Sequence, residues 1–289
     1  MFQENSPEFK LAIDSVLAAG KIVRTIYNSS FEVSWKSKDD PLTEADLQAN
    51  HAILENIQSN FPNDGILSEE VTDNIDRLTK ERVWILDPID GTREFVQKNP
   101  EFSISLGLAV NGTPVVGVMF SAITRELFAG IVGIGAAYLI LEEALELGNV
   151  KIVLSKLTFL EKKEKPTAYV SRSEFSKYKL FDENPYWKET FHLKPVGSIA
   201  YKLALTSANK ADLSLSLKPK SEWDVCAGIA LVLASGGAVV DLKHQTDIPF
   251  NSKTPKLEGI LAGNPLLIDQ ILKDKSDFYR KSLVDWDNK

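Results

Sequence analysis

Cysteine is almost absent from this sequence. The 289 residues include a single cysteine, Cys226. One cysteine excludes an internal disulfide and is typical of a protein in a reducing compartment.

An excess of basic residues is missing too. The formal net charge is −7 and the pI is near 5.2, whereas a nucleic-acid binder usually carries a basic patch or stripe. We therefore expect no nucleic-acid polymer as a partner.

Long apolar runs and a targeting segment are also lacking. The runs at 131–141 and 228–240 are shorter than the roughly 18–20 residues that span a bilayer. The N-terminus is polar, without the basic start and apolar stretch of a signal peptide. These features predict no membrane partner and a cytoplasmic location.

What the sequence does contain is an alternation of helical and strand patterns. Helical spacing of apolar residues predicts helices at 8–27, from Thr43 to about Phe61, at 199–208 and at 225–234. Short apolar runs predict strands at 65–67, 83–86, 103–110, 115–120, 126–131, 167–170, 212–217 and 238–240. This order predicts a layered α/β architecture with mixed sheets.

Three local patterns add detail to this prediction. Asn111-Gly112 between two strands indicates a hairpin. Residues 83–86 are apolar on both faces, so we expect a buried central strand there. The apolar stripe of the helix after Thr43 is expected to comprise Leu47, Leu54, Ile57 and Phe61.

The sharpest motif is Asp87-Pro88-Ile89-Asp90-Gly91-Thr92, directly after that buried strand. Pro88 fixes its own φ and Gly91 permits close backbone approach, so the segment predicts a tight turn with two carboxylates. Two carboxylates at a buried strand end repel each other unless a cation lies between them. The alternative is an Asp-Pro turn in which Asp90 only caps a short helix.

Three further acidic elements occur where a strand ends or a helix begins. Glu69 follows an apolar run, Asp224 is expected to open the helix at 225–234, and Asp46 belongs to the capping-box pattern that starts at Thr43. Each has a structural alternative: a surface acidic pair for Glu69, an N-cap for Asp224 and capping alone for Asp46.

Together these elements form an oxygen-only set of metal ligands. Such a set disfavours Zn²⁺ and favours Mg²⁺ or Mn²⁺, which commonly accompany phosphate chemistry. Backbone N–H groups of Gly91, Thr92 and Arg93, at the start of a helix expected at 92–97, could bind phosphate oxygens. Asp87 and Asp90 are three residues apart, not two as in Asp-x-Asp phosphatases, which points to a metal-activated water rather than an aspartyl nucleophile.

The ordered set of Asp46, Glu69-Glu70, Asp87 to Thr92 and Trp223-Asp224-x-x-Ala-Gly228 resembles the inositol monophosphatase superfamily of lithium-sensitive phosphatases. The resemblance implies a five-layer sandwich of alternating helices and sheets. It implies one catalytic domain with two lobes, roughly 1–160 and 161–289, in which the second lobe carries Asp224 and the substrate contacts.

The resemblance also implies roles for the acids. Glu69, Asp87 and the carbonyl of Ile89 would hold one Mg²⁺, and Asp87, Asp90 and Asp224 a second. Thr92, hydrogen-bonded to Asp46, would orient the attacking water together with Glu69. Two or three ions are expected, with Mn²⁺ as a possible substitute and Li⁺ as an inhibitor.

The finer resemblance is to 3′(2′),5′-bisphosphate nucleotidases. Asp90-Gly-Thr-Arg-Glu-Phe95 and Gly197-Ser198-Ile-Ala-Tyr-Lys202 look like segments of that branch, which implies substrate contacts from Arg93, Gly197, Ser198 and Lys202. Leu217 stands where inositol monophosphatases usually have a sugar-binding glutamate, and the basic residues nearby are Lys218 and Lys220.

Three functions therefore stay open. The first is hydrolysis of adenosine 3′,5′-bisphosphate, and the second is hydrolysis of inositol 1-phosphate or of sugar phosphates. The third is a catalytically silent relative that binds a ligand, which the intact acidic set disfavours. A homodimer is compatible with each, and residues 71–82 are a candidate mobile lid beside the site.

Overall fold

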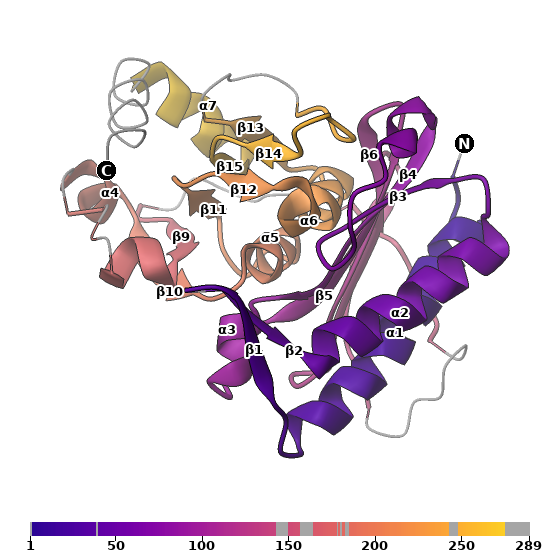
Figure 1. Ribbon diagram of the computed structural model, residues 1–289. Helices are drawn as coiled ribbons and strands as arrows, with labels where there is room; N and C mark the ends of the chain where they lie inside the picture. The colour runs from indigo at the N-terminus through magenta and orange to yellow at the C-terminus, as the bar shows by residue number, and fades with distance from the viewer. Residues whose placement is uncertain are drawn as a thin grey trace.

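Six strands from the first half of the chain form the larger sheet of the computed structural model (Figure 1). The structure describes residues 2–38, 40–142, 150–156, 164–177, 179, 181–182, 185–242 and 248–274. In spatial order the strands are β3 (Gly65–Ser68), β4 (Arg82–Asp90), β5 (Ser103–Val110), β6 (Thr113–Ser121), β7 (Glu126–Ile131) and β8 (Gly135–Ile140). Only β3 and β4 are parallel, so this sheet is mixed, as predicted.

Local sequence explains the centre of this sheet. Strand β4 lies between β3 and β5 and is buried except at its two ends, which confirms the central strand. Asn111 and Gly112 join β5 to β6 with φ values of 49° and 77°. Positive φ at both loop residues is the geometry that a tight two-residue hairpin requires.

Helices α1 (Pro7–Tyr27) and α2 (Glu44–Asn60) cover one face of the sheet (Figure 1). The predicted stripe of α2 is wrong at Leu47, which is 49% exposed. The helix instead buries Ala45, Ala49, Ile53 and Ile57. The small alanines at this contact let α1 and α2 approach closely. A prediction based on large apolar residues does not detect such a face.

Helices α5 (Ile199–Ser207) and α6 (Glu222–Ala234) cover the opposite face and separate it from a second sheet. That sheet has the order β10 (His192–Val196), β9 (Thr167–Ser171), β11 (Leu213–Ser216), β15 (Ile260–Gly263) and β13 (Ala238–Asp241). Its outer side packs against α4 (Pro185–Thr190) and α7 (Pro265–Asp274). The result is the predicted sequence of five layers, helix–sheet–helix–sheet–helix (Figure 1).

The remaining elements are short. They are the paired strands β1 (Val33–Ser37) and β2 (Asp40–Thr43), the paired strands β12 (Lys220–Ser221) and β14 (Lys256–Leu257), α3 (Thr92–Val96), the 3-10 turn η1 (Ile75–Thr79) and the π-helical turn η2 (Ser173–Lys177). The β1–β2 hairpin was not predicted because its first strand is largely exposed and has no apolar alternation. Helix α3 ends at Val96, one residue earlier than expected.

The candidate lid, residues 71–82, contains η1 and is tied down at its middle. The buried Arg77 pairs with Asp73 through two nitrogens at 2.6 and 2.8 Å, and it donates to the Asn251 side chain at 2.7 Å. Any closing motion would have to carry or break these contacts, so the lid stays a prediction.

Two further expectations concern the whole chain. The predicted boundary between the lobes, at 160–161, lies outside the described residues. Among the residues that the structure describes, no helix is both long and apolar enough to cross a membrane.

Candidate active site

Strand β4 carries two aspartates, and a bulge turns both to one face of the sheet. Asp87 lies opposite Ser105 of β5, and Asp90 lies opposite Ser103. Three steps along β4 therefore match two steps along β5, which is a β-bulge. Because side chains alternate along a strand, residues three apart would otherwise point to opposite faces. The extra residue brings Asp87 and Asp90 to the side on which α5 and α6 lie.

Glu69 reaches the same place from the end of β3. This strand is parallel to β4, with Ser68 level with Leu86, and the Glu69 N–H donates to the Leu86 carbonyl at 3.2 Å. The carboxyl ends of neighbouring parallel strands open at one edge of a sheet, where α/β proteins commonly bind ligands. Glu69 therefore lies beside Asp87.

Asp224 comes from α6, which lies very close to the sheet. A Cβ at Gly117 would be 2.2 Å from the Ala227 carbonyl oxygen, and one at Gly107 would be 2.6 Å from Cys226 Sγ. Only glycine permits this approach, which lowers the start of α6 onto the end of β4.

The prediction that Asp224 opens its helix is wrong by two residues. The helix begins at Glu222, and Asp224 accepts the Ser221 N–H through Oδ2 at 2.9 Å. The cap therefore uses one carboxylate oxygen and leaves the second for the site.

The three acids converge. One carboxylate oxygen from each of Glu69, Asp87 and Asp224 lies within 4.8 Å of the other two. Burial and the neighbouring carboxylates raise the pKa of Asp87 well above its usual value, and burial and Asp90 raise the pKa of Asp224 to about 8. A bound cation would offset the repulsion between these buried carboxylates. A donor set made only of oxygen suits Mg²⁺.

Two buried hydroxyl groups support the same interpretation. Ser103 and Ser105 lie opposite Asp90 and Asp87 on β5, and their Oγ atoms have no hydrogen-bond partner among the described residues. Buried polar atoms are normally satisfied, so two unpartnered hydroxyls beside Asp87 and Asp90 suit a polar, ion-binding centre better than an apolar one.

Asp90 links the acids to the second lobe. Its Oδ2 accepts hydrogen bonds from the Ser198 hydroxyl and, at 2.6 Å, from the Ala200 N–H at the start of α5. Its charge helps to raise the pKa values of Asp87 and Asp224. The alternative in which Asp90 caps the short helix after the motif is wrong, because α3 begins after Gly91 and has no side-chain cap. Asp90 instead accepts the Ala200 N–H of α5, and its role as a metal ligand stays a prediction.

Thr92 and Asp46 are hydrogen-bonded, as the resemblance implied. Thr92 Oγ1 lies 3.1 Å from Asp46 Oδ1 and 3.0 Å from the Ile89 carbonyl oxygen. Asp46 is buried, and its Oδ2 accepts from the Thr43 N–H at 2.8 Å and the Thr43 hydroxyl at 2.6 Å. The capping box fixes the carboxylate so that its other oxygen faces Thr92.

Lys36 is a site residue that the sequence did not reveal. From β1, its ammonium pairs with Glu69 at 2.9 Å and with Glu70 at 2.5 Å. The hairpin is 33 residues from Glu69 in sequence and has a polar pattern typical of a surface loop, so no local signal marked this contact.

Lys202 is buried, and its ammonium is held by the backbone. Its Nζ donates to the Ser198 carbonyl at 2.9 Å and to the Val196 carbonyl at 3.1 Å. Burial lowers the pKa of Lys202 to about 8. A substrate contact stays a prediction, and the visible effect is to hold residues 196–198 where Ser198 meets Asp90.

The acids line a cleft of about 440 Å³ together with basic and hydroxyl side chains. All of the predicted substrate residues line it. So do residues that were not predicted, among them Arg172, Ser171, Ser173 and Lys220. Arg172 pairs with Glu101, which also accepts the Gly197 N–H at 2.7 Å.

Comparison with known proteins identifies this arrangement. A model of the inositol monophosphatase family matches residues 4–278. The chain belongs to the inositol monophosphatase family. Members of this family hydrolyse phosphate monoesters, so the chain is a phosphatase of that class. The family is Mg²⁺-dependent, and the cluster of Glu69, Asp87 and Asp224 could hold a metal ion.

Two curated relatives match over nearly their full lengths. An inositol monophosphatase from Mesembryanthemum crystallinum is 29% identical over 268 residues, which cover 91% of this chain and 93% of the relative. The Nus factor SuhB of Escherichia coli strain K12 is 27% identical over 278 residues, or 94% and 96% of the two chains.

Two solved structures share the fold of this family member. The suhB protein of Bartonella henselae has a TM-score of 0.77 and 23% identity, over 96% of this chain and 98% of its own. CysQ of Bacteroides thetaiotaomicron has a TM-score of 0.71 and 26% identity, over 89% and 97%. The predicted five-layer architecture is thereby confirmed.

Proposed function

We propose that this family member acts on a phosphate monoester with a second phosphate group, best represented by adenosine 3′,5′-bisphosphate. The observation behind the proposal is a basic wall, Arg93, Arg172 and Lys220, that lines the same cleft as the acids. One phosphate would bind at the acidic centre, and guanidinium and ammonium groups suit the other.

The acidic centre fits two Mg²⁺ ions. Glu69, Asp87 and the Ile89 carbonyl would hold one, while Asp87, Asp90 and Asp224 would hold the other; Mn²⁺ could replace them and Li⁺ would inhibit. When bound, such ions lower the pKa of a water and neutralise charge on the phosphate and leaving group.

The protein's own groups orient the reactants. Asp46 holds the Thr92 hydroxyl, and with Glu69 this hydroxyl is placed to position a water for attack on phosphorus. The N–H groups of Gly91 and Thr92, where the chain enters α3, would bind the transferred phosphate. Gly91 adopts a φ of 100°, which lets the backbone make this turn.

The basic wall would bind the second phosphate and the nucleoside. Arg93, Gly197 and Ser198 are the proposed contacts from the predicted set, and Arg172 and Lys220 join them. Lys202 is proposed to act by holding the 196–198 turn, because backbone carbonyls already accept from its ammonium.

A second candidate substrate is inositol 1-phosphate or another sugar phosphate. The supporting observation is the match to the Mesembryanthemum inositol monophosphatase along nearly the whole chain. Against it, Leu217 has an apolar side chain that cannot hydrogen-bond to a sugar, and it is buried.

The deciding experiment measures phosphate release from both substrates with Mg²⁺, with and without millimolar Li⁺. We expect a higher kcat/KM for adenosine 3′,5′-bisphosphate. A preference for inositol 1-phosphate would reject the nucleotide and keep the metal site.

Asp87→Asn is the control for that metal site. We expect it to reduce kcat by about 10³-fold or more, since Asp87 is a ligand shared by both proposed ions. Near-normal kcat at saturating Mg²⁺ in this variant would contradict the proposed centre. A wild-type enzyme that turns over neither substrate would reject both as the physiological substrate.

A further inference from the structure

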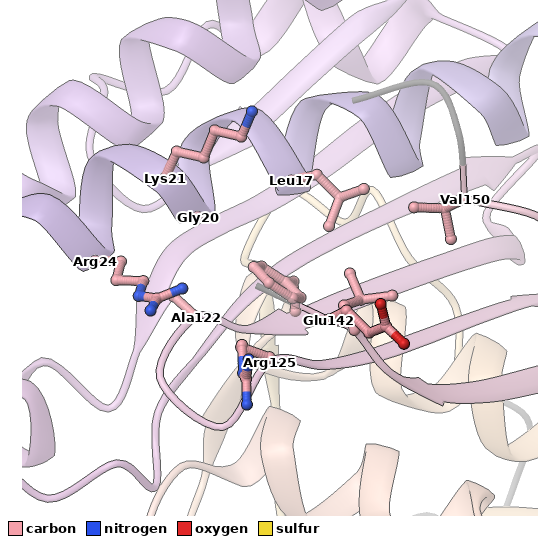
Figure 2. Close-up of a pocket in the computed structure, with 10 residues that line it drawn as sticks. Leu17, Gly20, Lys21, Arg24, Ala122, Arg125, Glu142 and Val150 are labelled. Carbon is pink, nitrogen blue, oxygen red and sulfur yellow. The ribbon is translucent and has the colours of Figure 1, made fainter. Parts of the chain in front are cut away.

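A second hollow lies on the opposite face of the sheet from the catalytic cleft, between α1 and the turn that joins β6 to β7 (Figure 2). Its volume is about 70 Å³, and none of its described lining residues belongs to the cleft. The described residues that line it are Leu17, Gly20, Lys21, Arg24, Phe120, Ala122, Arg125, Leu141, Glu142 and Val150.

The floor of this hollow is apolar and closely packed. Leu17, Phe120 and Leu141 are buried side chains. The Phe120 ring packs directly against α1, because a Cβ at Gly20 would be only 2.4 Å from its Cε1 atom. Since a cavity of about 150 Å³ admits benzene, this smaller hollow suits a short aliphatic group.

The rim is cationic although the protein as a whole is acidic. Among the described lining residues, Lys21, Arg24 and Arg125 are basic and Glu142 is the one acid, whereas the chain carries a net charge of −7 (Figure 2). The local excess of positive charge favours an anion at this position.

Arg125 is the residue that points most clearly to a ligand. It is half-buried at a φ of 60° in the β6–β7 turn, and no acidic side chain of the described chain pairs with it. Guanidinium groups withdrawn from water are usually paired with an anion. Its planar fork matches carboxylate and phosphate oxygens alike.

We propose that this hollow is a second binding site, specific for a small organic anion with a short branched apolar end. The acid group, a carboxylate or a phosphate, binds the Arg125 guanidinium. The apolar end enters the space above Phe120. This site is independent of the phosphatase reaction and of the identity of its substrate.

The test is a methyl NMR titration of the Mg²⁺-saturated protein labelled at isoleucine, leucine and valine. The probes are isovalerate and isobutylphosphonate. Two control compounds accompany them: acetate has the charge without the apolar end, and isobutanol has the apolar end without the charge. Leu17, Leu141 and Val150 report on the hollow, while Ile89 and Ile199 report on the cleft.

We expect saturable shifts at Leu17, Leu141 and Val150 with isovalerate, the phosphonate or both. The stronger of the two identifies the source of the acid group. Acetate and isobutanol should each bind at least about tenfold more weakly, because a charge-assisted hydrogen bond and apolar burial each contribute more than about 1 kcal/mol.

Matched variants separate this site from general charge effects. Arg125→Asn removes the guanidinium while tolerating the positive φ, and it should weaken binding at least about tenfold. Lys10→Gln removes an exposed charge elsewhere on α1 and should change nothing. Shifts confined to Ile89 and Ile199, no saturable shift with either anion, or equal affinity in Arg125→Asn would overturn the proposal.

Discussion

Two aspartates of the site each cap a helix through one carboxylate oxygen. Asp46 and Asp224 each accept a backbone N–H from the residue before a helix through Oδ2. The other oxygen of Asp46 accepts from Thr92, and Asp224 contributes one carboxylate oxygen to the cluster with Glu69 and Asp87. Capping and catalysis are therefore compatible at these positions, and the cap fixes the orientation that the chemistry needs.

The hydroxyl of Thr92 provides a direct test at this scale. Thr92→Ala should lower kcat by about 10²–10⁴-fold, the usual contribution of a positioned proton-transfer group. Thr92→Ser keeps the hydroxyl and should retain most of the activity. Phosphate release measures kcat for both variants. A Thr92→Ala variant with the same kcat as Thr92→Ser would show that the Thr92 hydroxyl has no part in the mechanism.

Lys202 can be tested by separating kcat from KM. Lys202→Met should lower kcat about 10–100-fold, the usual cost of losing a residue that orients a ligand-bearing segment. A direct substrate contact would instead raise KM for the bisphosphate and leave kcat unchanged. Steady-state kinetics on adenosine 3′,5′-bisphosphate distinguishes the two roles.

At the scale of elements, the contact between α6 and the sheet places Asp224. Gly117→Ala should reduce the free energy of unfolding by about 1–3 kcal/mol, as overpacking usually does. It should also raise the Mg²⁺ concentration needed for half-maximal activity, because α6 must move away from β6. Thermal unfolding and a Mg²⁺ titration measure the two effects.

Gly133→Ala is the control for that substitution. Gly133 has a φ of 84°, and among the described residues no atom beyond its chain neighbours lies within 4 Å of where an alanine Cβ would be. Its cost is therefore backbone strain alone, about 1 kcal/mol. An unchanged Mg²⁺ requirement in Gly117→Ala, as in this control, would show that the close contact does not position Asp224.

Elements with a continuous apolar pattern were predictable from sequence, and polar ones were not. The strands at 103–110 and 126–131 have the expected ends, because they are buried along most of their length. The exposed β1 strand lacked any such signal. Likewise, the alanine-rich face of α2 does not stand out by hydrophobicity, which is why Leu47 was misplaced.

The acidic half of the site was predictable for a related reason. Its residues belong to short motifs in which a strand or helix boundary is visible in the sequence. Lys36, Arg172 and Lys220 come from separate polar segments that only the folded layers bring together. Their approach depends on tertiary packing, and no local pattern encodes it.

At the scale of the molecule, the buried acids couple stability to pH. The folded pKa of Asp224 is about 8, above the ordinary value of 3.8, so the metal-free folded state binds a proton that the unfolded chain releases. Between about pH 4 and 8 the free energy of unfolding should therefore fall as pH rises. Mg²⁺ should restore it, with a larger gain in Tm at about pH 8 than at about pH 5.

Asp224→Asn isolates this effect from other titrations. The variant cannot ionise at this position, so its unfolding free energy in EDTA should depend less on pH over the same range. Chemical denaturation at several pH values measures the slopes. Identical slopes for wild type and variant would contradict the assignment.

The bulge in β4 makes the relative orientation of the two carboxylates depend on the number of residues between them. Asp87 and Asp90 share a face because an odd spacing in sequence coincides with one extra residue in the strand. An odd spacing in a regular strand, or an even spacing across the bulge, would send one carboxylate toward α1 and α2. A strand with one bulge therefore requires an odd spacing between two side chains that share a face. A single-residue insertion or deletion between the two acids that leaves the bulge in place should therefore be more damaging than most substitutions.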